Sequence, residues 1–134
     1  HTNYEGKAQA AADVLLKEGY DFVYVHVEAP DEMGHQGSVE RKVQAIEYLD
    51  QRLIVHLKEA LDTSGEDYRM MILPDHPTPI CVRTHTSDPI PYLLYDSRKA
   101  FAGSSGVYNE KAAQASGIEV MHGYELIDKL FEEK

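Results

Sequence analysis

The sequence predicts an α/β fold with a mostly parallel sheet and helices on both faces of that sheet. Two apolar runs with the composition of strands, residues 21–27 and 67–73, flank one long amphipathic pattern over residues 38–61. A helix of this length between two strands favours a parallel pair joined by a right-handed crossover. The continuous hydrophobicity of residues 71–73 also indicates a strand covered on both faces, which is typical of parallel sheets.

Composition restricts the classes of function. The 134 residues suffice for one compact domain, and 43% of them are apolar. A net charge of -10 argues against a nucleic-acid-binding surface, and no apolar run approaches the roughly 18 residues of a membrane span. Cys81 is the single cysteine, so no internal disulfide is possible and a cytoplasmic location is expected. The expected partners are small molecules or metal ions, without nucleic acid or membrane.

The first half of the chain contains clear helix boundaries. A first helix is expected from a cap at Thr2 or Asn3 to about Glu18, before Gly19. The strand over residues 21–27 then leads into a polar loop, residues 28–37, whose two glycines indicate a tightly turned backbone. The long helix that follows is capped by Ser38.

The second half predicts shorter elements. They are strands over residues 67–73, 80–82 and 91–95, a short helix from a cap at Asn109 to Ala115, and a terminal amphipathic helix over residues 124–131. Residues 96–117 are otherwise expected to be irregular. The Gly103–Gly106 segment is interpreted as a flexible loop, because it lacks the lysine and the strand-to-helix context of a phosphate-binding loop.

Asp75 and His76 follow an apolar strand directly, at the point where Pro74 and Pro77 end it. Adjacent side chains point to opposite faces of a strand, so this pair can serve one site only where the backbone turns. Ligands of open α/β sheets bind beyond the carboxyl ends of the strands, where the pair would lie. Taken alone, the pair is more simply a surface turn in which Asp75 caps the backbone.

Three more candidate ligands lie in two other polar segments. Asp31 and His35 are four residues apart, which places both side chains on one side of a helical turn, and His85 lies in a third segment. Carboxylates and imidazoles without a thiolate suit Mn²⁺, Zn²⁺ or Mg²⁺, and five ligands exceed what one catalytic ion takes from protein. Two neighbouring divalent ions are therefore predicted. Such a pair can activate a nucleophile and clamp phosphoryl oxygens.

Three segments carry these five residues. They are Asp31-Glu32-Met33-Gly34-His35, Pro74-Asp75-His76-Pro77-Thr78-Pro79 and Thr84-His85-Thr86-Ser87-Asp88-Pro89-Ile90-Pro91. They resemble the metal-binding motifs of cofactor-independent phosphoglycerate mutases of the archaeal-type branch, in the alkaline phosphatase superfamily. The resemblance runs along the whole chain and implies an alkaline-phosphatase-like fold. It implies that Asp31, His35 and His85 hold one ion and that Asp75 and His76 hold the other, with Mn²⁺ preferred.

The resemblance also implies a glycolytic isomerase that interconverts 2- and 3-phosphoglycerate through a phosphoserine in the intact protein. The family's serine and the inserted domain that binds most of the phosphoglycerate have no counterpart here, so no catalytic nucleophile is assigned. Residues 1–134 are expected to be the C-terminal portion of the metal-binding phosphatase-like domain, inactive by themselves. A phosphatase or a homoserine kinase of the same superfamily shares the metal motifs and stays an alternative, as does a catalytically inactive metal-binding domain.

Overall fold

The computed structural model describes residues 3–99, 108–120 and 122–131. Thr2 and the Gly103–Gly106 loop lie outside the described residues. The elements are α1 (Tyr4–Leu16), α2 (Ala29–Gln36), α3 (Val39–Tyr48), the π-helix η1 (Leu49–Ile54), α4 (Val55–Ser64), β1 (Arg69–Ile72), β2 (Leu93–Asp96), α5 (Glu110–Ala115), the 3-10 helix η2 (Gly123–Glu125) and α6 (Leu126–Phe131). They form two compact units: a first unit of residues 1–66 and 78–86, and a second unit of residues 67–77 and 87–134.

The first unit is built on two long helical segments, and both begin where their caps predict. The Asn3 side chain accepts a hydrogen bond from the Gly6 amide at 3.0 Å, and Ser38 accepts one from the Arg41 amide at 3.3 Å. The helix that starts after Ser38 continues through α3, η1 and α4 to Ser64, where Gly65 ends it with a φ of 76°. Both predicted helices are therefore confirmed, although the π-helical turn was not expected.

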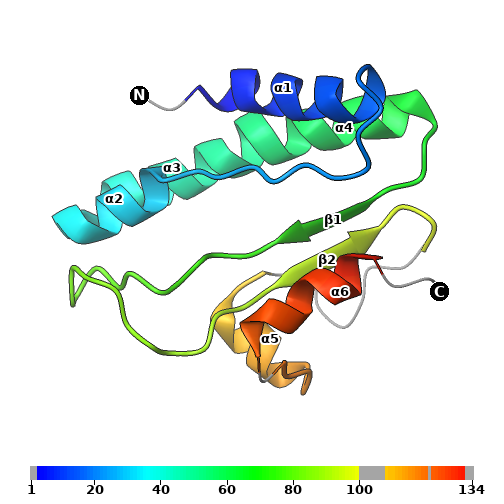
Figure 1. The fold of residues 1–134 in the computed structure, drawn as a ribbon. Helices are drawn as coiled ribbons and strands as arrows, with labels where there is room; N and C mark the ends of the chain where they lie inside the picture. The colour runs from blue at the N-terminus through cyan, green and yellow to red at the C-terminus, as the bar shows by residue number, and fades with distance from the viewer. Residues whose placement is uncertain (1–2, 100–107, 121, 132–134) are drawn as a thin grey trace. The chain divides into compact units, whose positions relative to one another are not determined.

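Helix α1 packs along η1 and α4 (Figure 1). Small side chains on α1 allow this close approach. The buried apolar residues of the unit are Tyr4, Ala8, Ala11, Ala12, Ala45, Leu53, Leu57 and Leu61. At the edge of this core the Arg52 guanidinium lies 5.2 Å and 5.0 Å from the ring centroids of Tyr4 and Tyr48. Arg52 also pairs with Glu5, and this hydrogen bond holds the pKa of Glu5 below its usual value.

The segment expected to be a polar loop is largely the helix α2, which corrects the prediction for residues 28–37. Pro30 lies in its first turn, where the missing amide hydrogen costs nothing, and Gly37 ends the helix with a φ of 70°. Pro30 and Gly37 were therefore the residues in the sequence that could have indicated a helix here. Helix α2 lacks the broad apolar stripe by which amphipathic helices are recognised in a sequence. It packs against the neighbouring α3.

Two expected strands are not among the strands of the structure. Residues 22–28 have no regular secondary structure, and the Lys7 ammonium donates a hydrogen bond to the carbonyl oxygen of His26 at 2.9 Å. A β-branched run favours an extended backbone, but a strand also requires a regular hydrogen-bonded ladder. A parallel pairing of residues 21–27 with 67–73 stays a prediction. Residues 80–82 form a turn, in which the Val82 and Arg83 amides donate to the Pro79 carbonyl.

In the second unit, β1 and β2 form an antiparallel pair in which Arg69 lies opposite Asp96 and Ile72 lies opposite Leu93. Both strands were predicted. The β1 residues are half-buried rather than covered on both faces. The predicted helices after Asn109 and near the end of the chain are α5 and α6, the second of them preceded by η2.

An ion cluster around the Asp96 carboxylate, which is 6% exposed, connects the β1–β2 pair to α6. Arg98 donates to it at 2.9 Å and Arg69 at 3.0 Å, and Arg69 also donates to the carbonyl oxygen of Leu130 at 3.3 Å. The hydrogen bonds from Arg98, with a smaller contribution from Arg69, hold the pKa of Asp96 far below its usual range.

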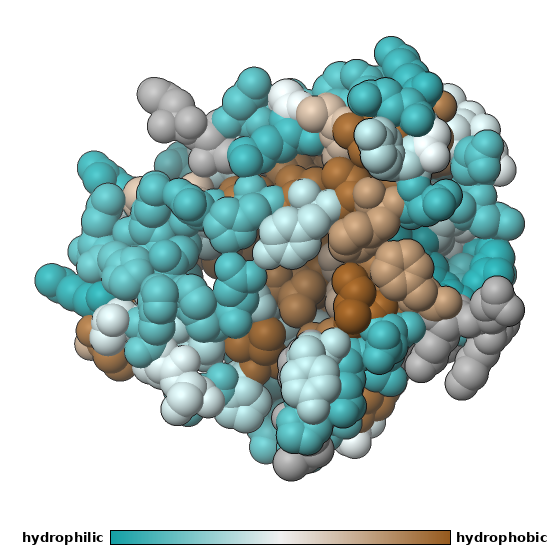
Figure 2. Space-filling model, in the orientation of Figure 1, coloured by the Kyte–Doolittle hydropathy of each residue, from teal (hydrophilic) through white to brown (hydrophobic). Residues whose placement is uncertain are grey.

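The visible face in Figure 2 is covered mainly by hydrophilic residues, with hydrophobic residues exposed among them. Hydrophobic side chains on a protein surface are common. Within the described residues no helix is both long enough and apolar enough to cross a membrane.

Candidate metal centre

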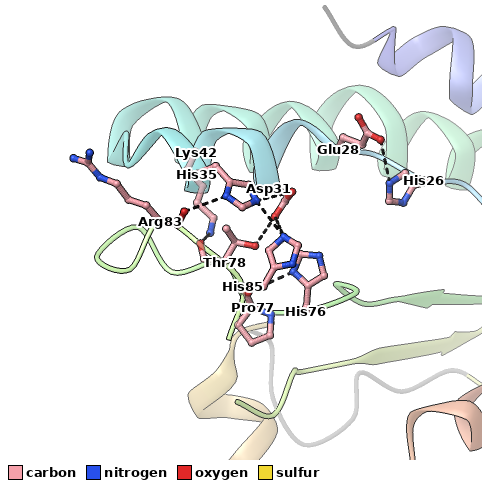
Figure 3. A network of polar contacts seen from close by, with 10 residues as sticks. All are labelled: His26, Glu28, Asp31, His35, Lys42, His76, Pro77, Thr78, Arg83 and His85. Carbon is pink, nitrogen blue, oxygen red and sulfur yellow. Dashed lines mark hydrogen bonds and ion pairs between the residues drawn. The ribbon is translucent and has the colours of Figure 1, made fainter. Parts of the chain in front are cut away.

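Asp31, His35 and His85, called here the donor group, lie together in the first unit (Figure 3). Asp31 and His35 come from α2, and His85 comes from the segment 78–86 that passes beside this helix. The Nε2 atoms of His35 and His85 are 3.1 Å apart. Each also lies 3.4 Å from a different carboxylate oxygen of Asp31, Oδ2 for His35 and Oδ1 for His85.

These distances fit a divalent cation. Nitrogen and oxygen ligands at about 2.1 Å from one ion lie about 3.0 Å apart in octahedral geometry and about 3.4 Å apart in tetrahedral geometry. One carboxylate and two imidazoles are also the donors that Mn²⁺ and Zn²⁺ accept. The three side chains are 36–50% exposed, which leaves room for further ligands from solvent or substrate.

The backbone of Arg83 fixes the tautomer of His35. Because a carbonyl oxygen can only accept, the 3.1 Å contact between Nδ1 of His35 and the Arg83 oxygen requires a proton on Nδ1. The neutral ring then presents the lone pair of Nε2 to the rest of the donor group. Hydrogen bonds of this kind orient histidine ligands in metal sites. The Arg83 side chain itself points away from the donor group (Figure 3).

The Arg83 backbone adopts an uncommon conformation, with a φ of 60°. For a residue other than glycine this left-handed geometry costs about 1–2 kcal/mol. It is held by the turn in which the Arg83 amide donates to the Pro79 carbonyl at 2.9 Å and by the bond from His35. A Cβ at Gly37 would meet only the flexible side chain of Arg83, so the need for glycine there comes from its φ of 70°, which side chains other than hydrogen disfavour.

Thr78 contacts the donor group directly, and Lys42 in turn contacts Thr78. Thr78 is 5% exposed, and its hydroxyl donates a hydrogen bond to Oδ1 of Asp31. The Lys42 ammonium on α3 donates to the carbonyl oxygen of Thr78 at 2.6 Å. Sequence reasoning missed Thr78, Lys42 and Arg83 as contributors. The only signal for Thr78 was its place between Pro77 and Pro79 in a ligand-bearing motif.

Asp75 and His76 belong to the second unit. They follow β1 after a short connection; Asp75 is exposed and His76 is half-buried. The Nδ1 hydrogen of His76 points to the carbonyl oxygen of Pro77 at 3.4 Å. Their role as ligands of a second ion stays a prediction.

Known proteins similar to this chain include several named 2,3-bisphosphoglycerate-independent phosphoglycerate mutase. The protein of Methanosarcina barkeri is 41% identical over 133 residues, which cover 99% of this chain and 33% of that protein. A probable mutase of Geobacter sulfurreducens is 40% identical over 98% of this chain and 32% of its own length. Mutase 2 of Methanothermobacter thermautotrophicus is 52% identical over 69% of this chain and 22% of its own length. The chain thus spans a third or less of these relatives.

A solved structure, that of the PH0037 protein from Pyrococcus horikoshii, is similar to this chain with a TM-score of 0.80 and 27% identity, over 99% of this chain and 40% of that protein. The likeness confirms the predicted α/β fold of alkaline-phosphatase-like type, and the mutase relatives confirm the resemblance found in the motifs. The family model described as the metalloenzyme superfamily matches residues 1–123. By this match over most of its length, the chain belongs to the metalloenzyme superfamily.

Proposed function

We propose that the donor group holds one divalent metal ion and that the whole protein uses it as a phosphoglycerate mutase. The observation that carries the proposal is the mutual spacing of the three donors, 3.1 Å between the imidazole nitrogens and 3.4 Å from each to Asp31. The names of the relatives support the mutase reaction rather than another phosphoryl transfer.

The residues of the donor group have distinct tasks in this proposal. Asp31 supplies one negative charge toward a divalent cation. The bond to Arg83 keeps the proton of His35 on Nδ1, so that Nε2 faces His85 and Asp31. His85 faces the same point from the other segment. A bound divalent ion would polarise a phosphoryl oxygen and lower the pKa of a hydroxyl nucleophile. We assign a second ion to Asp75 and His76 and expect Mn²⁺ in both places, with Zn²⁺ or Mg²⁺ as alternatives.

In the whole protein, phosphate would pass between the 2- and 3-hydroxyls of glycerate through a phosphoserine. No serine of residues 1–134 is assigned that role; Ser38, for example, is occupied in capping α3. We place residues 1–134 in the C-terminal portion of a phosphatase-like domain, and we place most of the phosphoglycerate contacts outside them. A glycolytic role in the cytoplasm follows from this reaction, without nucleic-acid or membrane partners.

An activity assay of the whole protein tests the proposal. The metal-depleted protein should interconvert the two phosphoglycerates only after Mn²⁺ is restored, and His85→Ala should reduce the rate by orders of magnitude. His56→Ala, which removes an exposed histidine of α4 in the same unit, is the matched control and should leave the rate unchanged. Release of inorganic phosphate without isomerisation would indicate a phosphatase, and dependence on ATP would indicate a kinase. Metal binding without any of these activities would indicate an inactive domain.

A further inference from the structure

We infer that Thr78 is a positioning residue that sets the orientation of the Asp31 carboxylate toward the metal ion. The inference rests on the proposed function, because it assumes that the donor group holds an ion. It assigns a task to a residue that supplies no metal ligand itself. The supporting observations are the hydrogen bond from Thr78 to Asp31, the burial of Thr78 and the contacts that hold its backbone.

The χ2 torsion, which rotates the carboxylate of an aspartate, has only a weak intrinsic preference. That torsion joins sp³ and sp² carbons, and its distribution is broad and roughly two-fold. In this structure the two oxygens of Asp31 have different partners. Oδ1 accepts from the Thr78 hydroxyl and lies 3.4 Å from His85, whereas Oδ2 lies 3.4 Å from His35. The hydroxyl thus selects the rotation in which each oxygen faces one imidazole.

Thr78 can fix Asp31 only because its own position is fixed. Pro77 and Pro79 flank it, and a following proline restricts Thr78 to extended backbone. The Lys42 ammonium, which reaches in from α3, donates to the Thr78 carbonyl at 2.6 Å. On α2, Gly34 leaves room for the same carbonyl, since a Cβ there would lie 2.6 Å from the oxygen. Contacts with α2 and α3 therefore fix the position of Thr78 beside the donor group.

The expected consequence is a change in metal affinity. Removal of a hydrogen-bonding partner of a metal ligand typically lowers affinity by about 10–100-fold. Thr78→Val keeps the shape of the side chain and removes the hydroxyl, so it should weaken Mn²⁺ binding by at least about tenfold. Thr78→Ser retains the hydroxyl and should bind Mn²⁺ within about threefold of the wild type, a rescue that a purely structural role of the methyl group would not produce.

Calorimetric Mn²⁺ titration at neutral pH measures this directly. The relevant binding phase is the one that Asp31→Asn abolishes. Ser38→Ala is the matched control: it removes a hydroxyl of the same unit that caps α3 and does not contact Asp31. It should lower the unfolding temperature without changing Mn²⁺ affinity. Far-ultraviolet circular dichroism shows whether each variant is folded.

Two results would overturn the inference: Thr78→Val with wild-type affinity, or Thr78→Ser as weak as Thr78→Val. If Thr78→Val does not fold, Lys42→Met replaces it. This variant keeps the hydroxyl but releases the Thr78 carbonyl, and wild-type affinity in it would equally overturn the inference. A wild-type protein that binds no Mn²⁺, or an Asp31→Asn variant that binds it normally, would instead contradict the proposed function.

Discussion

Replacement of Gly34 by alanine should destabilise the first unit, even though alanine is the better helix former. Gly34 is buried within α2. A Cβ at this position would lie 2.6 Å from the Thr78 carbonyl oxygen, 2.9 Å from Thr78 Cγ2 and 3.2 Å from the Lys42 ammonium. The first of these atoms belongs to the backbone and is held by Lys42, so it cannot move aside as a flexible side-chain end would.

The magnitude follows from opposing contributions. Replacement of glycine by alanine inside a helix stabilises by about 0.5–1 kcal/mol. Displacement of Thr78 would weaken its hydrogen bonds with Lys42 and Asp31, each of which involves a charged group and contributes about 1.5–3 kcal/mol. The free energy lost with one of these hydrogen bonds already exceeds the free energy gained from the higher helix propensity of alanine. We expect a net destabilisation of about 1–3 kcal/mol, because the segment will relax in part.

Urea unfolding followed by circular dichroism measures this difference. Gln36→Ala, at an exposed position of the same helix, is the control and should change stability by less than about 0.5 kcal/mol. Gly34→Ala should also weaken Mn²⁺ binding, because it moves the residue that orients Asp31. A Gly34→Ala protein that is as stable as the wild type, or more stable, would refute the close approach of α2 and Thr78.

Three further predictions concern pH. Because a protonated imidazole cannot bind a cation, Mn²⁺ affinity should fall at least about tenfold between about pH 7 and pH 5, and equal affinities would argue against histidine ligands. The pKa of Asp96 is depressed by Arg98, so its contribution to stability is complete above about pH 4 and is lost at lower pH. The gap in urea midpoint between wild type and Asp96→Asn should narrow below that pH, and a constant gap would contradict the ion cluster. Partial burial of Tyr108, which is still 41% exposed, raises the pKa of its hydroxyl to about 12. Ultraviolet titration of the wild type, but not of Tyr108→Phe, should show a tyrosine that ionises there, and the contribution of Tyr108 to stability should be lost as the pH rises from about 10.

Helices were the most predictable part of the fold. The caps at Asn3 and Ser38 are contacts between residues three apart, so they are visible in the sequence. Helix α2 was interpreted as a loop because its polar composition lacks an apolar stripe, and its packing on α3 is a tertiary contact. The strands expected over 21–27 and 80–82 were less predictable, because a strand depends on a partner that its own residues do not specify.

The ligands of the candidate site were identified from motif spacing and family resemblance, whereas the residues that support them were not. Asp31 and His35 are recognisable because four residues separate them on one helix. The bond from Thr78 joins it to Asp31 across 47 residues, and Lys42 reaches Thr78 across 36. Neither contact leaves a local pattern, because both depend on the path that the segment after Pro77 takes beside α2 and α3.

Anomalous diffraction from crystals of this protein grown with Mn²⁺ would test the donor group most directly. We expect a manganese peak about 2.1 Å from a carboxylate oxygen of Asp31 and from the Nε2 atoms of both His35 and His85. A peak that contacts only one of these three residues, or no peak beside them in crystals saturated with Mn²⁺, would contradict the assignment.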